Sequence, residues 1–223
     1  MLILMIRDEL AHLRRSPLIQ AVLAAIALLV PAALLASVEH VQAMSNLAIS
    51  GTAHLAALIT GSVVTASLIA DLQQGIPILF VVRPMPRAHF LLARGAGMTV
   101  VLLAALGLGV GCMLILNAVL VKAPLDPVAI LRGLLLARLP GVLLAMACGL
   151  LVGVLTAAIP GGLALFLLLT NALIIALQIG AAKVGGWVGW GPATQDWLLA
   201  AMTVAAAAAM VLWASIQFSR RSI

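Results

Sequence analysis

Long runs of apolar residues are the feature that most restricts how this chain can fold. Six such runs follow one another, each near the length of about 20 residues that a helix needs to cross the hydrocarbon core of a bilayer. Their bounds are residues 18–36, 47–70, 96–121, 139–157, 163–179 and 197–218. Hydrophobic residues make up 65% of the chain and charged residues only 8%, which leaves little polar surface for a water-soluble fold. The sequence therefore predicts an all-α polytopic membrane protein, with six transmembrane helices in a single transmembrane domain over residues 1–223.

The distribution of basic residues predicts the orientation in the membrane, because cytoplasmic loops carry an excess of Lys and Arg. Eight of the twelve basic residues fall on the face that holds both termini and the loop between the second and third spans. They are Arg7, Arg14, Arg15, Arg83, Arg87, Arg94, Arg220 and Arg221. We therefore expect both termini and the loop at residues 71–95 to be cytoplasmic. The net charge of +6 reflects this orientation, so it does not indicate that the chain binds nucleic acid.

Residues 1–17 are predicted to form an amphipathic helix in the cytoplasmic interface of the membrane. Their apolar residues recur at helical spacing and share one side, opposite the arginines. Glu9 falls inside the apolar arc, so its side chain either reaches up to water or contacts a partner protein. A signal peptide made of Arg14, Arg15 and residues 18–36 is the alternative. The patterned residues in front of the arginines favour the interfacial helix.

Several classes of membrane protein are disfavoured by what the chain lacks. No charged residue lies near the centre of a predicted span, which argues against a carrier or pump driven by an ion gradient. No phosphate-binding Gly-x-x-x-x-Gly-Lys-Ser/Thr loop is present, so any ATP hydrolysis of that type must come from another chain. The four histidines and two cysteines have no metal-ligand spacing. We predict neither a catalytic nor a metal site, while an intramembrane hydrolase with Ser62 or Ser67 opposite His54 remains an alternative.

The polar residues within the spans are candidates for either packing or a solvated path. Thr65 lies on the second span, where small hydroxyl residues commonly bond to backbone carbonyls between helices. Asn117, Asn171 and Gln178 are the strongest polar groups in or near the spans. Buried amides of this kind either bond across helices or line a path for a substrate. Thr65, Asn171 and Gln178 are the residues that we assign to a candidate substrate path.

Two Gly-x-x-x-Gly motifs lie on neighbouring spans, at residues 107–111 and 149–153. The absence of a side chain at both glycines lets two helix backbones approach closely. Each motif therefore predicts close packing, either within a compact bundle or between two copies of the chain.

The loop at residues 71–95 interrupts the apolar pattern for longer than a simple turn requires. Residues 72–82 are partly apolar and contain Pro77, and the run Arg-Pro-Met-Pro-Arg at residues 83–87 prevents a continuous helix, because each proline removes a donor and restricts the residue before it. Residues 88–94 can start a helix again. The loop is thus predicted to present a short basic helix and a rigid turn to the cytosol, with an ordinary solvated positive loop as the alternative.

This loop resembles that of the type-2 ATP-binding-cassette (ABC) transporter permeases. Members of that family commonly show an acidic residue, then Gly-Thr-Leu-Glu, an apolar triplet, Ser-Arg-Pro, a second Ser-Arg and, after an aromatic residue, Leu-Leu-Gly-Lys. The matching residues of this chain are Asp71, Gly75, Arg83, Pro84, Arg87 and Arg94. Residues 6–17 are similar to the elbow helix of the family, and the chain departs from the pattern at residues 76–78, where Ile-Pro-Ile replaces Thr-Leu-Glu. The haem-exporter B subunit of cytochrome c maturation is similar in length, in its six spans and in the Asp-Leu-Gln-x-Gly start, and it is a possible subtype.

The resemblance implies a permease subunit in the cytoplasmic membrane of a bacterium. Such a subunit pairs with a second copy or a homologous permease, and it binds two copies of a separate ATPase subunit that holds ATP and Mg²⁺. By itself it is not an enzyme and binds no cofactor. The expected substrate is hydrophobic or amphipathic, such as a lipid, a peptide or a drug-like molecule, and it is expected to be exported along spans one, two and five at the dimer interface.

The resemblance also implies roles for individual residues. Coupling to the ATPase is expected of the six loop residues that match the family pattern. Docking on the ATPase is expected of Glu9 and Arg14 in the elbow helix. The remaining alternatives are a haem-exporter-type permease and, in other classes, a membrane anchor or assembly subunit without transport, or an intramembrane hydrolase.

Overall fold

The computed structural model describes residues 41–73, 87–121 and 139–220, together with positions 7, 20, 24, 126, 128, 131–132 and 135–136. Regular secondary structure in these residues is entirely helical, which confirms the all-α prediction for the described part of the chain. The helices are α3 (Val41–Gln73), α5 (Arg87–Leu116), α7 (Leu139–Leu155), α8 (Ile159–Val188) and α9 (Pro192–Arg220). A short π-helical segment, η1 (Asn117–Val121), follows α5 directly.

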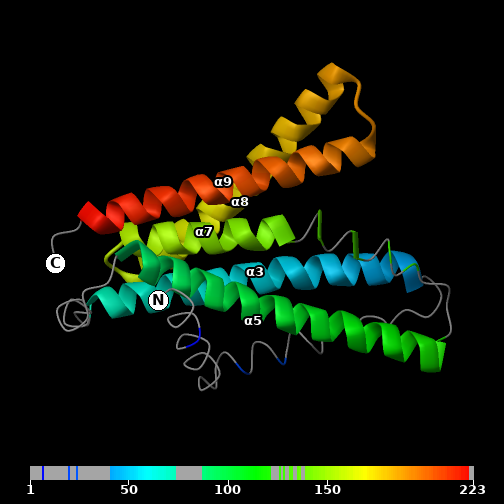
Figure 1. Cartoon of the computed structure of the whole chain (residues 1–223), viewed down its shortest axis with the longest axis horizontal. Helices are drawn as coiled ribbons and strands as arrows, with labels where there is room; N and C mark the ends of the chain where they lie inside the picture. Colours follow the sequence, from blue (N-terminus) through cyan, green and yellow to red (C-terminus); the bar gives the residue numbers. More distant parts are fainter. Residues whose placement is uncertain are drawn as a thin grey trace.

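Helix α7 lies at the centre of this arrangement, with α9 on one side, α3 on the other and α5 beside α3 (Figure 1). Every residue of α7 from Leu144 to Val154 is buried. A helix that is apolar around its whole circumference has no face suited to water, and it is stabilised by neighbours on all sides. The composition of residues 139–155 therefore explains why this helix occupies the core.

Within the part of the chain that the structure describes, three helical segments are long and apolar enough to cross a membrane, namely His89–Val119, Ile159–Val188 and Thr194–Arg220. They contain 31, 30 and 27 residues. At about 1.5 Å per residue they measure roughly 40–46 Å, whereas the hydrocarbon core of a bilayer is about 30 Å thick. The segments Ala57–Gln73 and Leu139–Leu155 are shorter apolar helices. These lengths support a membrane protein, while the predicted number of six spans and the orientation stay predictions.

The loop at residues 71–95 differs from its prediction. Residues 71–73 form the end of α3, and α5 runs without interruption from Arg87 to Leu116. Residues 88–94, predicted to be a separate short helix, are therefore the opening turns of a long helix. The reason is that no proline follows Arg87 in this stretch, and Leu91 and Arg94 are buried against the bundle. The predicted break lies at residues 74–86, outside the described residues, and so do residues 1–17 of the predicted elbow helix except Arg7.

Helix α8 is longer than the predicted span at residues 163–179. It begins at Ile159, with Pro160 in its first turn where a missing N–H costs nothing. It continues through Gly185 and Gly186 to Val188. The absence of a side chain at Gly185 leaves space for the side chain of Gln195 on α9. A Cβ atom at Gly185 would lie 2.6 Å from Cγ of Gln195. The helix ends at Gly189, whose φ of 70° is the left-handed conformation that glycine adopts readily.

The two Gly-x-x-x-Gly motifs have different surroundings. A Cβ atom at Gly149 would lie 2.7 Å from the carbonyl oxygen of Gly61, and one at Gly153 would lie 2.9 Å from Leu68, so this motif packs α7 tightly against α3. At Gly107 and Gly111 no described atom lies within 4 Å of such a Cβ. The first contact confirms the predicted packing role for residues 149–153 within the bundle.

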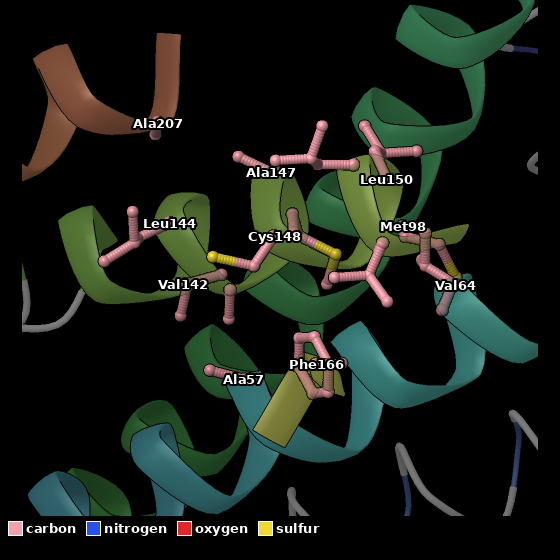
Figure 2. Close-up of a cluster of buried hydrophobic side chains, with 14 of the residues drawn as sticks. Ala57, Val64, Met98, Val142, Leu144, Ala147, Cys148, Leu150, Phe166 and Ala207 are labelled. Carbon is pink, nitrogen blue, oxygen red and sulfur yellow. The ribbon is translucent and has the colours of Figure 1, made fainter. Parts of the chain in front are cut away.

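Phe166 of α8 completes the core between α3 and α7. Figure 2 shows its ring beside the α3 ribbon that carries Ala57, below Cys148 of α7. The ring is fully buried, and a Cβ atom at Gly61 would lie only 2.4 Å from it. The glycine on α3 thus makes the space that the aromatic ring fills, which joins α3, α7 and α8 into one packed unit.

Candidate functional site

The described ends of the break at residues 74–86 lie at one end of the helical bundle. The last turn of α3, the first turns of α5 and the last turn of α9 are together at this end (Figure 1). Three of the six loop residues to which the sequence assigns a function, Asp71, Arg87 and Arg94, flank this break. We therefore take the group formed by Asp71, Phe90, Arg94 and Phe218, called the junction from here on, as the candidate site.

An ion pair joins the two ends of the break. Nη1 of Arg94 on α5 donates a hydrogen bond to Oδ2 of Asp71 on α3. The Arg94 side chain is only 10% exposed and that of Asp71 is 28% exposed, so water screens the pair much less than it screens a surface pair. Removing one partner of a shielded pair leaves the other charge poorly compensated, which costs more than the pair itself contributes. The ion pair therefore holds α3 and α5 together on either side of residues 74–86.

Aromatic contacts extend the ion pair to the C-terminal helix. Cζ of Arg94 lies 5.9 Å from the centroid of the Phe90 ring, within the range of a cation–π contact. Phe90 and Arg94 share one side of α5 because they are four residues apart. The Phe90 ring stacks in turn on Phe218 of α9, with the centroids 6.3 Å apart and the planes inclined by 24°. Since Phe218 is fully buried, the last turn of α9 is anchored in the junction.

A hydrogen bond links α3 to the turn between α7 and α8. Nε2 of Gln73, the last residue of α3, donates to the carbonyl oxygen of Ala157 at 2.6 Å. Ala157 lies in the short turn that reverses the chain before Ile159. The end of α3 is thus tied both to α5 and to the α7–α8 turn.

Of the residues assigned to ATPase coupling or docking, the structure brings Asp71 and Arg94 together. Arg87 is the first residue of α5. The others lie outside the described residues: Glu9, Arg14, Gly75, Arg83 and Pro84. The Arg94 side chain is buried and donates to Asp71. Its described contacts therefore lie within the bundle and not on a surface that a partner protein would bind.

The three residues assigned to the substrate path do not meet. Thr65 is fully buried, and its hydroxyl donates to the carbonyl oxygen of Gly61 at 2.8 Å and to that of Gly149 at 3.2 Å. It is therefore a packing residue between α3 and α7. Asn171 and Gln178 instead lie on the exposed face of α8, and Nδ2 of Asn171 donates to the carbonyl oxygen of Leu167 at 2.8 Å. The described residues thus place two of the three candidates on one helix face and the third in the core.

The geometry argues against the serine–histidine pair considered for a hydrolase. His54, Ser62 and Ser67 all lie on the single helix α3. At about 1.5 Å per residue, Ser62 is about 12 Å and Ser67 about 20 Å from His54 along the axis, far beyond hydrogen-bond distance. Among the described residues there is also no group of His, Cys, Asp and Glu that could hold a metal ion.

Sequence reasoning missed the aromatic half of the junction. The spacing of Phe90 and Arg94 on one helix was a usable signal for their contact. No local signal pointed to Phe218, because its partner lies 128 residues earlier in the chain. Gln73 was missed for the same reason, since its acceptor Ala157 is 84 residues away.

Comparison of the sequence with protein-family models and with curated proteins finds no match.

Proposed function

We propose that this chain is the permease subunit of an ATP-binding-cassette exporter of the type-2 kind. In this proposal the apolar run at residues 18–36 and the helices α3, α5, α7, α8 and α9 are its six spans, with both termini in the cytosol. ATP and Mg²⁺ bind to two copies of a separate ATPase subunit. The exported substrate is hydrophobic or amphipathic.

The observation that carries the proposal is the anchoring of the break at residues 74–86. This segment contains three of the six loop residues that resemble the permease pattern, Gly75, Arg83 and Pro84. The other three, Asp71, Arg87 and Arg94, lie on the helices at its two ends. Its two ends are bound to one another and to the ends of other helices through the Asp71–Arg94 ion pair and the Gln73 hydrogen bond. Because both ends of this segment are fixed to helices, a force that a cytosolic partner exerts on the segment is transmitted to the helical bundle. A loop with freely rotating ends does not transmit such a force.

The exposed amides of α8 support pairing of two permeases. Asn171 and Gln178 lie one above the other on the exposed face of a helix that is otherwise suited to lipid. An amide facing hydrocarbon is unfavourable, whereas an amide on a facing helix can satisfy it. In the proposed dimer this face of α8 meets the second permease, and the substrate passes beside it.

Co-purification tests the proposal. The tagged chain is expressed in its native membrane and isolated in mild detergent, and we expect an ATPase subunit to be retained in a one-to-one ratio. The double substitution Arg83→Glu with Arg87→Glu should lose this ATPase, because it reverses two charges in the proposed contact. Arg132→Glu is the matched control, since Arg132 is exposed and belongs to the predicted opposite face of the membrane. A wild-type preparation that contains no ATPase, or a double variant that still couples ATP hydrolysis to transport, would refute the assignment.

A further inference from the structure

We infer that Arg94 is a positioning residue that makes the end of α3, the start of α5 and the end of α9 move as one body. The inference concerns how the bundle is built at this end. Its consequence for transport, that motion of the ends of α3 and α5 reaches α9 through Arg94, rests on the proposed function.

Arg94 is suited to this role because it makes two contacts of different kinds at once. Its guanidinium donates to the carboxylate of Asp71 and also lies over the Phe90 ring. A guanidinium can pair with a carboxylate through its N–H groups while its plane contacts an aromatic ring, whereas an ammonium is a compact, strongly hydrated charge. Arg94 thus joins a charge contact with α3 to the Phe90 ring, and that ring stacks in turn on Phe218 of α9.

Burial makes the junction stiff. Arg94 has little contact with water, and Phe218 has none. Ala214, one turn before Phe218 on α9, is a small buried residue that allows a close approach of the helix to the bundle. The last turn of α9 therefore has little freedom to slide past α5 while the aromatic stack is in place.

The position of the junction determines which helix ends are connected rigidly. The described residues of α3 and α5 that adjoin the break carry Asp71 and Arg94, so both arms of the break begin at the junction. A displacement of the joined ends of α3 and α5 consequently acts on α9 through the Phe90–Phe218 stack. Because α9 packs against the central helix α7, it can carry this displacement along the bundle.

Distance measurements between spin labels test the inference without any partner protein. Labels at the exposed positions Leu92 on α5 and Ile216 on α9 report the spacing of the two helix ends. The native cysteines are first replaced by Cys112→Ser and Cys148→Ala. The wild-type junction should give a narrow distance distribution, and Arg94→Gln should lose the narrow peak.

Three further variants separate a specific junction from general loosening of the structure. Phe90→Leu retains the ion pair but removes the ring, and it should lose the narrow peak as Arg94→Gln does. The double variant should be no broader than either single variant, because both changes break the same connection. Arg220→Gln removes one positive charge from an exposed position at the end of α9 and should leave the peak unchanged. Should Arg94→Gln fail to fold, Arg94→Lys and Phe90→Leu carry the test, since the lysine retains the charge but stacks poorly.

The inference is overturned if the Arg94 variants keep the narrow peak, or if their effect simply adds to that of Phe90→Leu. When the ATPase is bound, ATP should shift the label distance in the wild type, and Arg94→Gln should lose this shift while the ATPase stays bound. A shift that survives in Arg94→Gln overturns the transmission through Arg94. Absence of an ATPase from the wild-type preparation refutes the proposed function instead, and the distances measured without nucleotide still decide whether the junction exists.

Discussion

Replacing Gly149 by alanine should force α3 and α7 apart. The added Cβ atom would lie 2.7 Å from the carbonyl oxygen of Gly61 and 3.2 Å from Oγ1 of Thr65. The nearer atom belongs to the backbone of the facing helix, so no side-chain rotation can relieve the contact. The two helices must therefore separate, which also weakens the hydrogen bond from Thr65 to the Gly149 carbonyl.

The expected change in the free energy of unfolding combines two destabilising contributions with one stabilising contribution. Overpacking of a tight core costs about 1–3 kcal/mol, and an interhelical hydrogen bond in a membrane protein contributes about 0.6 kcal/mol. Alanine is about 1 kcal/mol more favourable than glycine within a helix, and this gain offsets part of the loss. The net loss for Gly149→Ala is therefore about 0.6–2.6 kcal/mol.

The thiol of Cys148 provides the assay, because it is fully buried next to the substituted residue. In a Cys112→Ser background, the rate at which a maleimide labels Cys148 in mild detergent reports how often the bundle opens. A loss of 0.6–2.6 kcal/mol corresponds to labelling that is about 3- to 80-fold faster. Rates are normalised to each variant's labelling in excess SDS, so that a change in the intrinsic reactivity of the thiol is removed.

Gly141→Ala is the matched control on the same helix. No described atom lies within 4 Å of a Cβ atom at Gly141, so this variant gains the helix preference of alanine without a clash. It should label no faster than the wild type. If Gly149→Ala labels as slowly as Gly141→Ala, the close approach of α3 and α7 does not hold, and the reasoning fails.

Three further outcomes are expected. Phe166→Ala should destabilise the bundle by about 3–5 kcal/mol because it empties the space beside α3, whereas Leu168→Ala on the same helix, at a residue 71% exposed, should change stability by about 0.5 kcal/mol or less; equal shifts in melting temperature in detergent would contradict this. Thr65→Val should cost roughly 0.6–1.7 kcal/mol through its lost carbonyl bonds, measured by the same Cys148 labelling, and an unchanged rate would show that these bonds contribute nothing. Trp187 is 88% exposed near the α8–α9 turn. In a variant whose only tryptophan is Trp187, lipids brominated near the headgroup should quench the tryptophan fluorescence more than lipids brominated near the chain ends, because indole rings favour the interface. The reverse order would place the turn inside the bilayer.

Much of the fold follows from local patterns in the sequence. The apolar runs predict helices of bilayer length, and the structure has helices over the described parts of those runs. Three prolines and Arg83 within residues 74–86 predict a break between two of them. Helix ends were less predictable: Gly185 and Gly186 look like breakers in the sequence, but α8 continues through both, and Gly185 packs against Gln195 of α9.

The candidate site depended much more on contacts between distant parts of the chain. Arg94 resembles a cytosolic coupling residue when the loop is considered alone, yet it is turned inward by Asp71, 23 residues earlier. Thr65 resembles a residue of a polar path, and its two carbonyl acceptors instead make it part of the α3–α7 contact. In both cases the sequence shows a polar group, and only the neighbouring helix determines what that group bonds to.

By itself, the sequence determined that this is an all-α protein with helices suited to a membrane, because run length and hydropathy act within single segments. The tertiary structure decided which of the two Gly-x-x-x-Gly motifs is used for packing. Gly149 and Gly153 face α3, whereas no described atom lies within 4 Å of a Cβ atom at Gly107 or Gly111. It also decided that Phe218 closes the junction at the start of α5. The physical reason is that close packing selects among equivalent local patterns through partners that are far away along the chain.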